Sequence, residues 1–289
     1  MSRETIPAWL SGSLILGAFG ALLWFERRRP LRREVEPKLT RGARNLAVAG
    51  LGAVALQVTE NPIAKWLTAL VERRQLGLLK LVHLPVWLET ALAVVLLDYT
   101  LYVWHVVTHK VPFLWRFHLP HHVDLDLDAS TALRFHFGEL VLSVPWRAGQ
   151  IIGIGVSPLA LSIWQTLLLL SILFHHSNIE LPIAMERGLN RLIVTPRMHG
   201  IHHSIVEDET NSNWSSGLAM WDRLHRTIRL NVPQDEITIG VPAYQEPEDV
   251  ELVKIIPMPF GGQQPKWQLP DNGEPRRDPL PIPAEHLLA

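Results

Sequence analysis

The chain has 289 residues, with 27 Lys and Arg against 28 Asp and Glu and a formal net charge of −1. This balance gives no electrostatic basis for binding nucleic acid, and a hydrophobic content of 47% excludes a disordered chain. The sequence contains no Cys, so disulfides, iron–sulfur clusters and Cys-ligated zinc are excluded, and any metal must be bound by His or carboxylate. Long apolar blocks alternate with polar segments rich in His, a pattern that indicates a membrane protein with a soluble face.

Five apolar segments are candidates for membrane spans, because a helix needs about 20 apolar residues to cross a bilayer. They cover residues 9–25, 45–58, 84–104, 139–156 and 159–174. The first could be a signal peptide, but its basic flank follows the apolar run and no small-residue cleavage site precedes that flank, which favours a retained anchor. The second is short, and the amphipathic stretch after it fits a position at the membrane interface. The sequence therefore predicts four or five crossings.

A basic segment at residues 27–44 sets the expected orientation. By the positive-inside bias this segment is cytoplasmic, and alternate crossings then place residues 105–138 and those after residue 175 on the same side. Nearly all of the histidines lie there. We interpret the basic segment as a topology signal rather than a lipid-recognition site. After about residue 241 the sequence is Pro-rich and polar, which predicts an extended tail.

Three histidine clusters carry the chemistry. The first is a pair at i and i+4, which lies on one face of a helix, and each of the other two is a set at i, i+3 and i+4. The eight residues are His105 and His109, then His118, His121 and His122, then His199, His202 and His203. Eight histidines exceed the three or four positions of a zinc site, so the clusters favour two metals. Imidazole binds iron, zinc and copper alike, so the spacing does not identify the metal.

Motifs of several other enzyme classes are missing from the sequence. It has no His-Glu-x-x-His of zinc proteases, no Glu-x-x-His of soluble di-iron bundles, no Gly-x-Ser-x-Gly elbow and no phosphate loop. Two metals in an all-nitrogen shell close to a membrane favour oxidative chemistry over hydrolysis.

Taken together, these clusters and their flanking residues resemble the fatty acid hydroxylase/sterol desaturase superfamily. The similarity rests on residues 98–109, 114–122 and 199–203, with shorter motifs at 131–139, 174–178 and 221–224, and it extends over about residues 84–259. With the segregation of apolar segments, it implies an all-α fold in which four or five membrane helices lie beneath a cytoplasmic helical cap that holds a His-rich dimetal site. The expected divisions are membrane anchor helices with a basic loop (1–83), a fatty acid hydroxylase-like catalytic domain (84–240) and a Pro-rich tail (241–289).

The resemblance also implies a set of metal ligands and no catalytic residue beyond them. By motif position the ligands are His105, His109, His118, His121, His122, His176, His199, His202 and His203, with His136 a possible tenth or a residue that orients a ligand. His175 adjoins His176, and the sequence leaves open which of the two faces the metals. His83 and His286 lie outside every cluster and are interpreted as solvated.

Four polar residues are candidates for orienting the ligand imidazoles, because a metal-bound His usually donates its other N–H to a carboxylate or carbonyl. They are Asp98, Glu139, Asn178 and Asn213. Asp98 could equally cap a helix or form a pair at the membrane interface.

The function implied is that of a membrane-bound, O2-dependent di-iron oxidoreductase that hydroxylates or desaturates a C–H bond of a lipid, such as a sterol, fatty acyl or isoprenoid chain. Two Fe ions would be the cofactor, with Zn able to occupy the purified protein and O2 as co-substrate. The sequence has no Rossmann fingerprint and no Cys for an iron–sulfur cluster, so an external donor is expected, a reductase with a ferredoxin or a cytochrome b5-type protein. A bacterial protein of this kind would lie in the inner membrane.

Two alternatives remain at this point. One is a zinc-dependent membrane hydrolase that uses the same histidines with a metal-bound water. The other is a non-catalytic metal-binding membrane protein, which would place its polar ligands along a path inside the spans, whereas these histidines cluster at one membrane face. The substrate, the choice between hydroxylation and desaturation, and the oligomeric state are not readable from the sequence.

Overall fold

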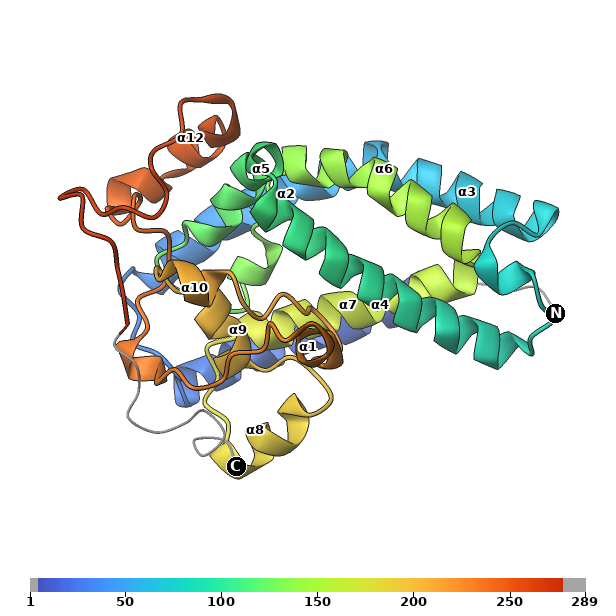
Figure 1. Ribbon diagram of the computed structural model, residues 1–289, viewed down its shortest axis with the longest axis horizontal. Coiled ribbons are helices and arrows are strands. Elements are labelled where there is room, and N and C mark those ends of the chain that lie inside the picture. The colour runs from blue at the N-terminus through green and yellow to red at the C-terminus, as the bar shows by residue number, and fades with distance from the viewer. Residues whose placement is uncertain (1–4, 278–289) are drawn as a thin grey trace.

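The structure is a computed structural model that describes residues 5–277, and these residues fold into helices joined by loops, with three isolated β-bridges (Figure 1). The all-α fold predicted from the sequence is confirmed. The longer helices are α1 (Ala8–Arg28), α2 (Lys38–Val58), α3 (Glu60–Arg74), α4 (Val86–Lys110), α5 (Pro112–His122), α6 (Phe137–Ile154) and α7 (Pro158–His176). The shorter ones are α8 (Ile183–Asn190), α9 (Pro196–His202), α10 (Glu207–Thr210), α11 (Met220–His225) and α12 (Leu252–Ile255), with 3-10 turns at Leu78–Lys80, Thr131–Leu133, Gln234–Glu236, Pro247–Val250 and Met258–Phe260.

Within the described residues, four helical stretches are long and apolar enough to cross a membrane. They are Ala8–Arg28, Lys38–Lys80, Val86–Lys110 and Pro158–His176, and they identify a membrane protein. The second stretch contains both α2 and α3, so the short span expected at residues 45–58 is part of a longer apolar region. The span expected at residues 139–156 forms α6, which is not one of the four, because Glu139, Arg147 and Gln150 reduce its hydropathy.

The long helices α3, α4, α6 and α7 pack around a shared apolar core. It includes Leu67 of α3, Leu97 of α4, Ile151 of α6 and Trp164 of α7. Arg147 of α6 lies over the ring of Trp164, 4.2 Å from its centroid, and pairs with Glu60 of α3. The bundle therefore pairs the polar groups of α6 instead of exposing them to lipid.

Helices α1, α4 and α7 all end on the same side of the molecule. The start of α1 contacts the start of α7, where the Ile6 N–H donates to Ser162 Oγ at 3.0 Å. Just beyond the ends of the same two helices, the Leu31 N–H donates to the carbonyl of Asn178 at 2.9 Å. The shorter helices α9, α10 and α12 gather at this end, on the left of Figure 1, and form a cap over the bundle.

Part of the basic segment is folded inward, where a topology signal alone would remain solvated: Arg32 and Arg41 are buried, whereas Arg27, Arg28, Arg29 and Arg33 are exposed. Arg41 is 1% exposed, and its guanidinium contacts Asp124, at 3.0 Å, and Asp128. Burial acts to raise the pKa of Asp124, but Arg41, Arg134 and Arg44 outweigh it and hold that pKa below its usual value. These ion pairs fasten the loop after α5 to α2, and so fix the end of a helix that carries three of the clustered histidines.

The segment after residue 241 also differs from the extended tail expected. Val241, Tyr244 and Ile255 are buried against Trp115 and Leu119 of α5. The guanidinium of Arg116 donates to the carbonyl oxygens of Pro259, at 3.0 Å, and Gly261, at 2.6 Å. Apolar burial and these hydrogen bonds fold the Pro-rich segment over α5. His286 and the last part of the tail lie outside the described residues.

Candidate metal centre

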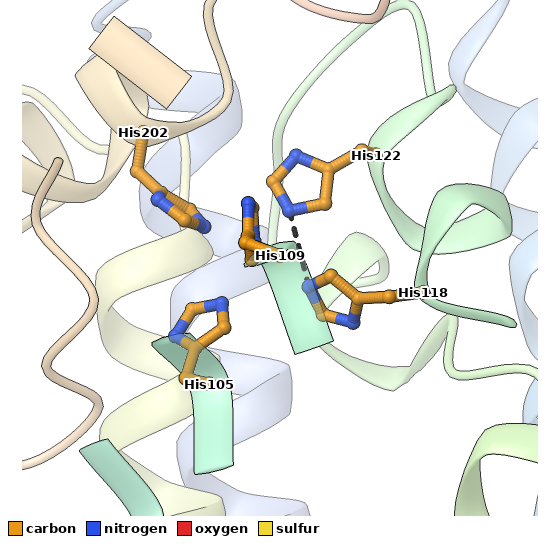
Figure 2. Close-up of side chains that lie close together, drawn as sticks. All are labelled: His105, His109, His118, His122 and His202. Carbon is orange, nitrogen blue, oxygen red and sulfur yellow. Dashed lines mark hydrogen bonds between the residues drawn. The ribbon is translucent and has the colours of Figure 1, made fainter. Parts of the chain in front are cut away.

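Nine histidines from four helices converge in two groups beneath the cap. The first group contains His105, His109, His118, His122 and His202, and the second contains His121, His176, His199 and His203. In each group one ring nitrogen per residue lies within 4.8 Å of all the others. Figure 2 shows the first group, with its rings pointing toward a common centre. The described residues thus contain two candidate metal sites built from imidazoles alone.

Helical periodicity explains how two helices serve both groups. On α5, His118 and His122 are one turn apart and belong to the first group, while His121 between them points to the second. On α9, His199 belongs to the second group and His202 to the first, and His203, directly after the helix, belongs to the second. Both helices begin with Pro at the first turn, where Pro is favoured.

The spacing of the nitrogens fits a metal coordination shell. In the second group, His176 Nε2 lies 3.1 Å from both His121 Nε2 and His199 Nε2, and His199 Nε2 lies 3.2 Å from His203 Nε2. Ligands about 2.1 Å from a shared ion would be about 3.0–3.4 Å apart. Since His176 Nδ1 lies 2.8 Å from the carbonyl of Ile172, which can only accept, Nδ1 carries the hydrogen and Nε2 presents a lone pair. The four Nε2 atoms are therefore close enough to bind one cation together, or to share N–H···N hydrogen bonds when no cation is bound.

Oxygen acceptors fix the outer nitrogen of three rings in the first group. His105 Nδ1 lies 2.7 Å from the carbonyl of Trp214, and His202 Nδ1 lies 2.7 Å from that of Ser212. His118 Nδ1 contacts Glu139 Oε1 at 2.9 Å. Each contact selects the tautomer whose Nε2 is free to bind metal. Sequence reasoning named Glu139 but missed the carbonyls, because every residue carries one and no side chain marks those that face a ligand.

Burial keeps the clustered imidazoles of the cap neutral. It lowers the pKa of His121, His122, His199 and His203 well below 6.5, and the charges of neighbouring histidines lower it further. For His202, burial lowers the pKa to about 3. Neutral imidazole is the form that binds metals, so these side chains are in the binding form at neutral pH. The described structure also leaves His202 Nε2 and both ring nitrogens of His109 buried without a hydrogen-bond partner, as expected of atoms that bind a metal.

The structure brings together the nine histidines singled out as ligands, but not His136. His136 lies at the start of α6, where Nδ1 accepts from the Gly138 N–H at 3.0 Å and Nε2 lies 3.0 Å from the carbonyl of Ile256. Both nitrogens are thus engaged away from the two groups. Of the neighbours at the end of α7, His176 belongs to the second group, while the ring centroid of His175 lies 4.1 Å from that of His199, with the two rings tilted by 52°.

The other three polar candidates form hydrogen bonds with the chain around the site instead of with a clustered imidazole. Asp98 Oδ2 accepts from the Leu218 N–H at 3.0 Å and from Trp221 Nε1 at 2.8 Å. Asn178 exchanges hydrogen bonds with the backbone of Arg32. Asn213 donates to the carbonyl of Met198 on α9 at 2.9 Å. Sequence reasoning also missed Asp222, which accepts the N–H groups of Trp214 and Ser215 and so holds the carbonyl of Trp214 beside His105.

The fold and the site define a helical membrane protein with two groups of clustered histidines, each able to hold a metal ion, at one end of its bundle. The sequence model of the fatty acid hydroxylase family matches residues 90–227. This segment includes all nine histidines, so the part of the chain that holds the candidate site is similar to the fatty acid hydroxylase family.

Curated relatives of this segment act on lipids. Over 160 residues the chain is 32% identical to an ornithine lipid hydroxylase of Rhizobium tropici, covering 54% of this chain and 46% of the relative. It is 28% identical to an alkylglycerol monooxygenase of Xenopus tropicalis (54% and 34% covered) and 28% identical to the human cholesterol 25-hydroxylase (46% and 48%). The chain thus spans about half or less of the length of these relatives. No solved structure matches the chain.

Proposed function

We propose that this protein is an O2-dependent lipid hydroxylase whose nine clustered histidines bind two iron ions. The observation that carries the proposal is the pair of buried imidazole groups, five rings and four, each with its ligand atoms within 4.8 Å of one another. The relatives are hydroxylases and monooxygenases of an ornithine lipid, an alkylglycerol and a sterol, and this similarity supports a lipid C–H bond as the target.

When bound, a pair of irons would supply the redox chemistry by which O2, two electrons and two protons convert a C–H bond into C–OH and water. The histidines would bind the ions through their Nε2 atoms, and hydrogen bonds to the outer nitrogen hold several of the imidazole rings in place. Glu139 and the carbonyls of Trp214 and Ser212 hold their imidazoles in one tautomer, so that no proton has to leave when a metal binds. Burial keeps the rings neutral and excludes water.

Aromatic side chains contribute to that exclusion on both groups. The ring of Trp115 lies 4.9 Å from that of His109 and 5.4 Å from that of His122. Phe135 stacks on His121 with ring centroids 4.4 Å apart. Because α4 and α7 are both candidate spans that end in proposed ligands, a lipid could approach the site without leaving the bilayer.

We also propose that the two electrons come from a separate protein, a reductase with a ferredoxin or a cytochrome b5-type carrier, since the chain has no Cys for an iron–sulfur cluster. The cap would lie on the cytoplasmic side, as the basic segment at the end of α1 favours.

The test is the metal content of protein expressed with added iron and purified in mild detergent, compared with a His202→Ala, His203→Ala double variant. Two irons per chain are expected in the native protein, with most of this metal lost in the variant, because each substitution removes a ligand from a different group. His83→Ala is the control, since His83 is exposed and outside both groups.

Iron-loaded protein should then hydroxylate a lipid from a mixed extract only when O2 and a reductant are supplied. Zinc that persists through expression with iron, together with activity under anaerobic conditions, would favour a metallohydrolase instead. Protein that binds no metal would contradict the proposal.

A further inference from the structure

One edge of the cap carries exposed apolar side chains together with arginines. The exposed fraction is 51% for Met185 on α8, 68% for Leu192, and 45% and 63% for Met220 and Leu224 on α11. The two segments lie side by side, since the Ala219 N–H donates to the carbonyl of Leu192 at 3.0 Å and Arg223 donates to Asn190. We call this the α8/α11 surface, and it is formed by Met185, Leu192, Met220 and Leu224 with Arg191, Arg223 and Arg226.

The charges on this surface all have one sign. Arg191, Arg223 and Arg226 are exposed. The acidic residues of the same two helices, Glu186 and Asp222, are 2% and 0% exposed and are engaged inside the protein. An outward-facing surface of long apolar side chains and arginines is complementary to phospholipid, because apolar chains enter the acyl region and arginines reach phosphate groups.

The position of α11 along α4 gives the second argument. Asp98 accepts from Trp221 Nε1, and the ring of Tyr99 lies 4.9 Å from that of Trp221. Tyr102 stacks on His225 at 5.0 Å. A span requires about 20 residues, and every stretch of that length within Val86–Lys110 includes these three residues of α4. The outer face of α11 therefore lies at a depth where α4 is in the membrane.

The backbone around α11 is suited to that depth, because buried partners satisfy its polar groups. The N–H of Leu218 donates to Asp98, those of Trp214 and Ser215 donate to Asp222, and the carbonyl of Gly217 accepts from Val194. The N–H groups of this loop are turned into the protein, and apolar side chains of α11 are turned out.

From these observations we propose that the α8/α11 surface is inserted into one leaflet of the bilayer, where its arginines bind anionic phospholipid headgroups. Because α11 packs against a stretch of α4 that lies within the membrane, lipid is favoured as the occupant of this surface over a second copy of the chain or another protein. Insertion would hold the cap against the membrane at the end of the bundle where the two histidine groups lie. The proposal depends on no metal and no activity.

Spin labelling tests it directly, because the chain has no Cys and a single introduced Cys is the only labelling site. Leu192→Cys and Leu224→Cys carry nitroxides on the surface. Val253→Cys is the control, being apolar and 76% exposed on α12, which Figure 1 places at the opposite edge of the cap from α8. The full chain is reconstituted in vesicles of phosphatidylcholine with phosphatidylglycerol, and collisions with O2, which concentrates in the bilayer, are compared with collisions with a water-soluble nickel chelate.

The ratio of O2 to nickel collisions should be several-fold higher at 192 and 224 than at 253. Equal ratios at the three positions would show that the surface faces water and would overturn the proposal. Labels shielded from both reagents, or broadened by coupling to a label on another chain, would also overturn it and indicate a protein contact. Helical circular dichroism and monodisperse elution establish that each variant is folded.

The depth of a spin label also tests whether the arginines bind anionic headgroups. With an Arg191→Gln, Arg226→Gln pair added to Leu224→Cys, the label at 224 should lie shallower, and replacing phosphatidylglycerol by phosphatidylcholine should no longer change its depth. A depth that responds to phosphatidylglycerol equally with and without the arginines would remove the headgroup contact from the proposal.

Discussion

The two histidine groups share two helices but differ in how the protein holds them. In the group of five, oxygen atoms contact the outer nitrogen of His105, His118 and His202. In the group of four, a carbonyl contacts the outer nitrogen of His176, while those of His121, His199 and His203 are buried without a partner in the described structure. The first group is largely oriented by the chain, whereas the second depends more on the metal itself. A hydrogen bond at the outer nitrogen holds the imidazole in its binding orientation and lowers the free-energy cost of metal binding. The two histidine groups should therefore differ in metal affinity.

The largest expected effect is the loss of one metal when a ligand of only one group is removed. His109→Ala should empty the group of five, and His199→Ala the group of four, each leaving about one metal per chain. Mutation of a residue that hydrogen-bonds to a metal ligand typically lowers activity 10–100-fold. Loss of a ligand itself, in either variant, should reduce lipid hydroxylation by more than that. Metal analysis and product detection measure both quantities. Loss of both metals in each variant would mean that the groups are not independent, and His83→Ala should change neither quantity.

Removing Glu139 should weaken metal binding by the group of five. The Glu139→Ala change takes away the carboxylate beside His118 Nδ1 and should lower the affinity of the first group about 10–100-fold, while Glu139→Gln keeps an oxygen acceptor and should lower it less. Titration with a chelator in the His199→Ala background isolates this group. An equal loss for Gln and Ala would show that charge, and not a hydrogen-bond acceptor, is what His118 requires.

The comparison itself is tested with the two single-metal variants. His199→Ala retains the group of five and His109→Ala retains the group of four, so a competing chelator measures each affinity separately. We expect the group of five to bind about tenfold more tightly, because three of its rings are fixed by oxygen and it has one more ligand. Equal affinities, or tighter binding by the group of four, would show that hydrogen bonds at the outer nitrogens contribute little here.

Acid should destabilise the metal-free protein. Burial lowers the pKa of His121, His122, His199 and His203 in the folded state, and that of His202 to about 3. Below pH 6.5 the unfolded chain therefore binds more protons than the folded one, so stability is complete above 6.5 and falls as the pH drops toward the folded pKa values. Each such residue costs up to about 1.4 kcal/mol per pH unit. The melting temperature in detergent should fall between pH 7.5 and 5.5, and substituting His202 by Gln should reduce the slope.

The sequence predicted the parts of this site that depend on local periodicity. Spacing at i, i+3 and i+4 places His118 and His122 together because helices repeat every 3.6 residues, and the resemblance identified His176 on a separate helix. The partners of the outer nitrogens were not predictable, since the carbonyl of Ser212 belongs to a loop whose path is set by tertiary contacts. The same reason applies to Arg41, whose sequence neighbours indicated a solvated loop but whose carboxylate partners come from a segment after α5.

His136 gives the smallest expected effect and tests whether position in a motif is enough to make a ligand. Its two ring nitrogens form hydrogen bonds with the N–H of Gly138 and the carbonyl of Ile256. His136 therefore caps α6 and links it to the segment that covers α5. The His136→Ala change should cost about 1 kcal/mol of stability, as the loss of a helix cap does, and leave two metals per chain. Metal analysis beside a melting curve separates the two roles. If a metal were lost at unchanged melting temperature, His136 would have to turn toward the second group on metal binding, and the helix cap would be a feature of the metal-free state alone.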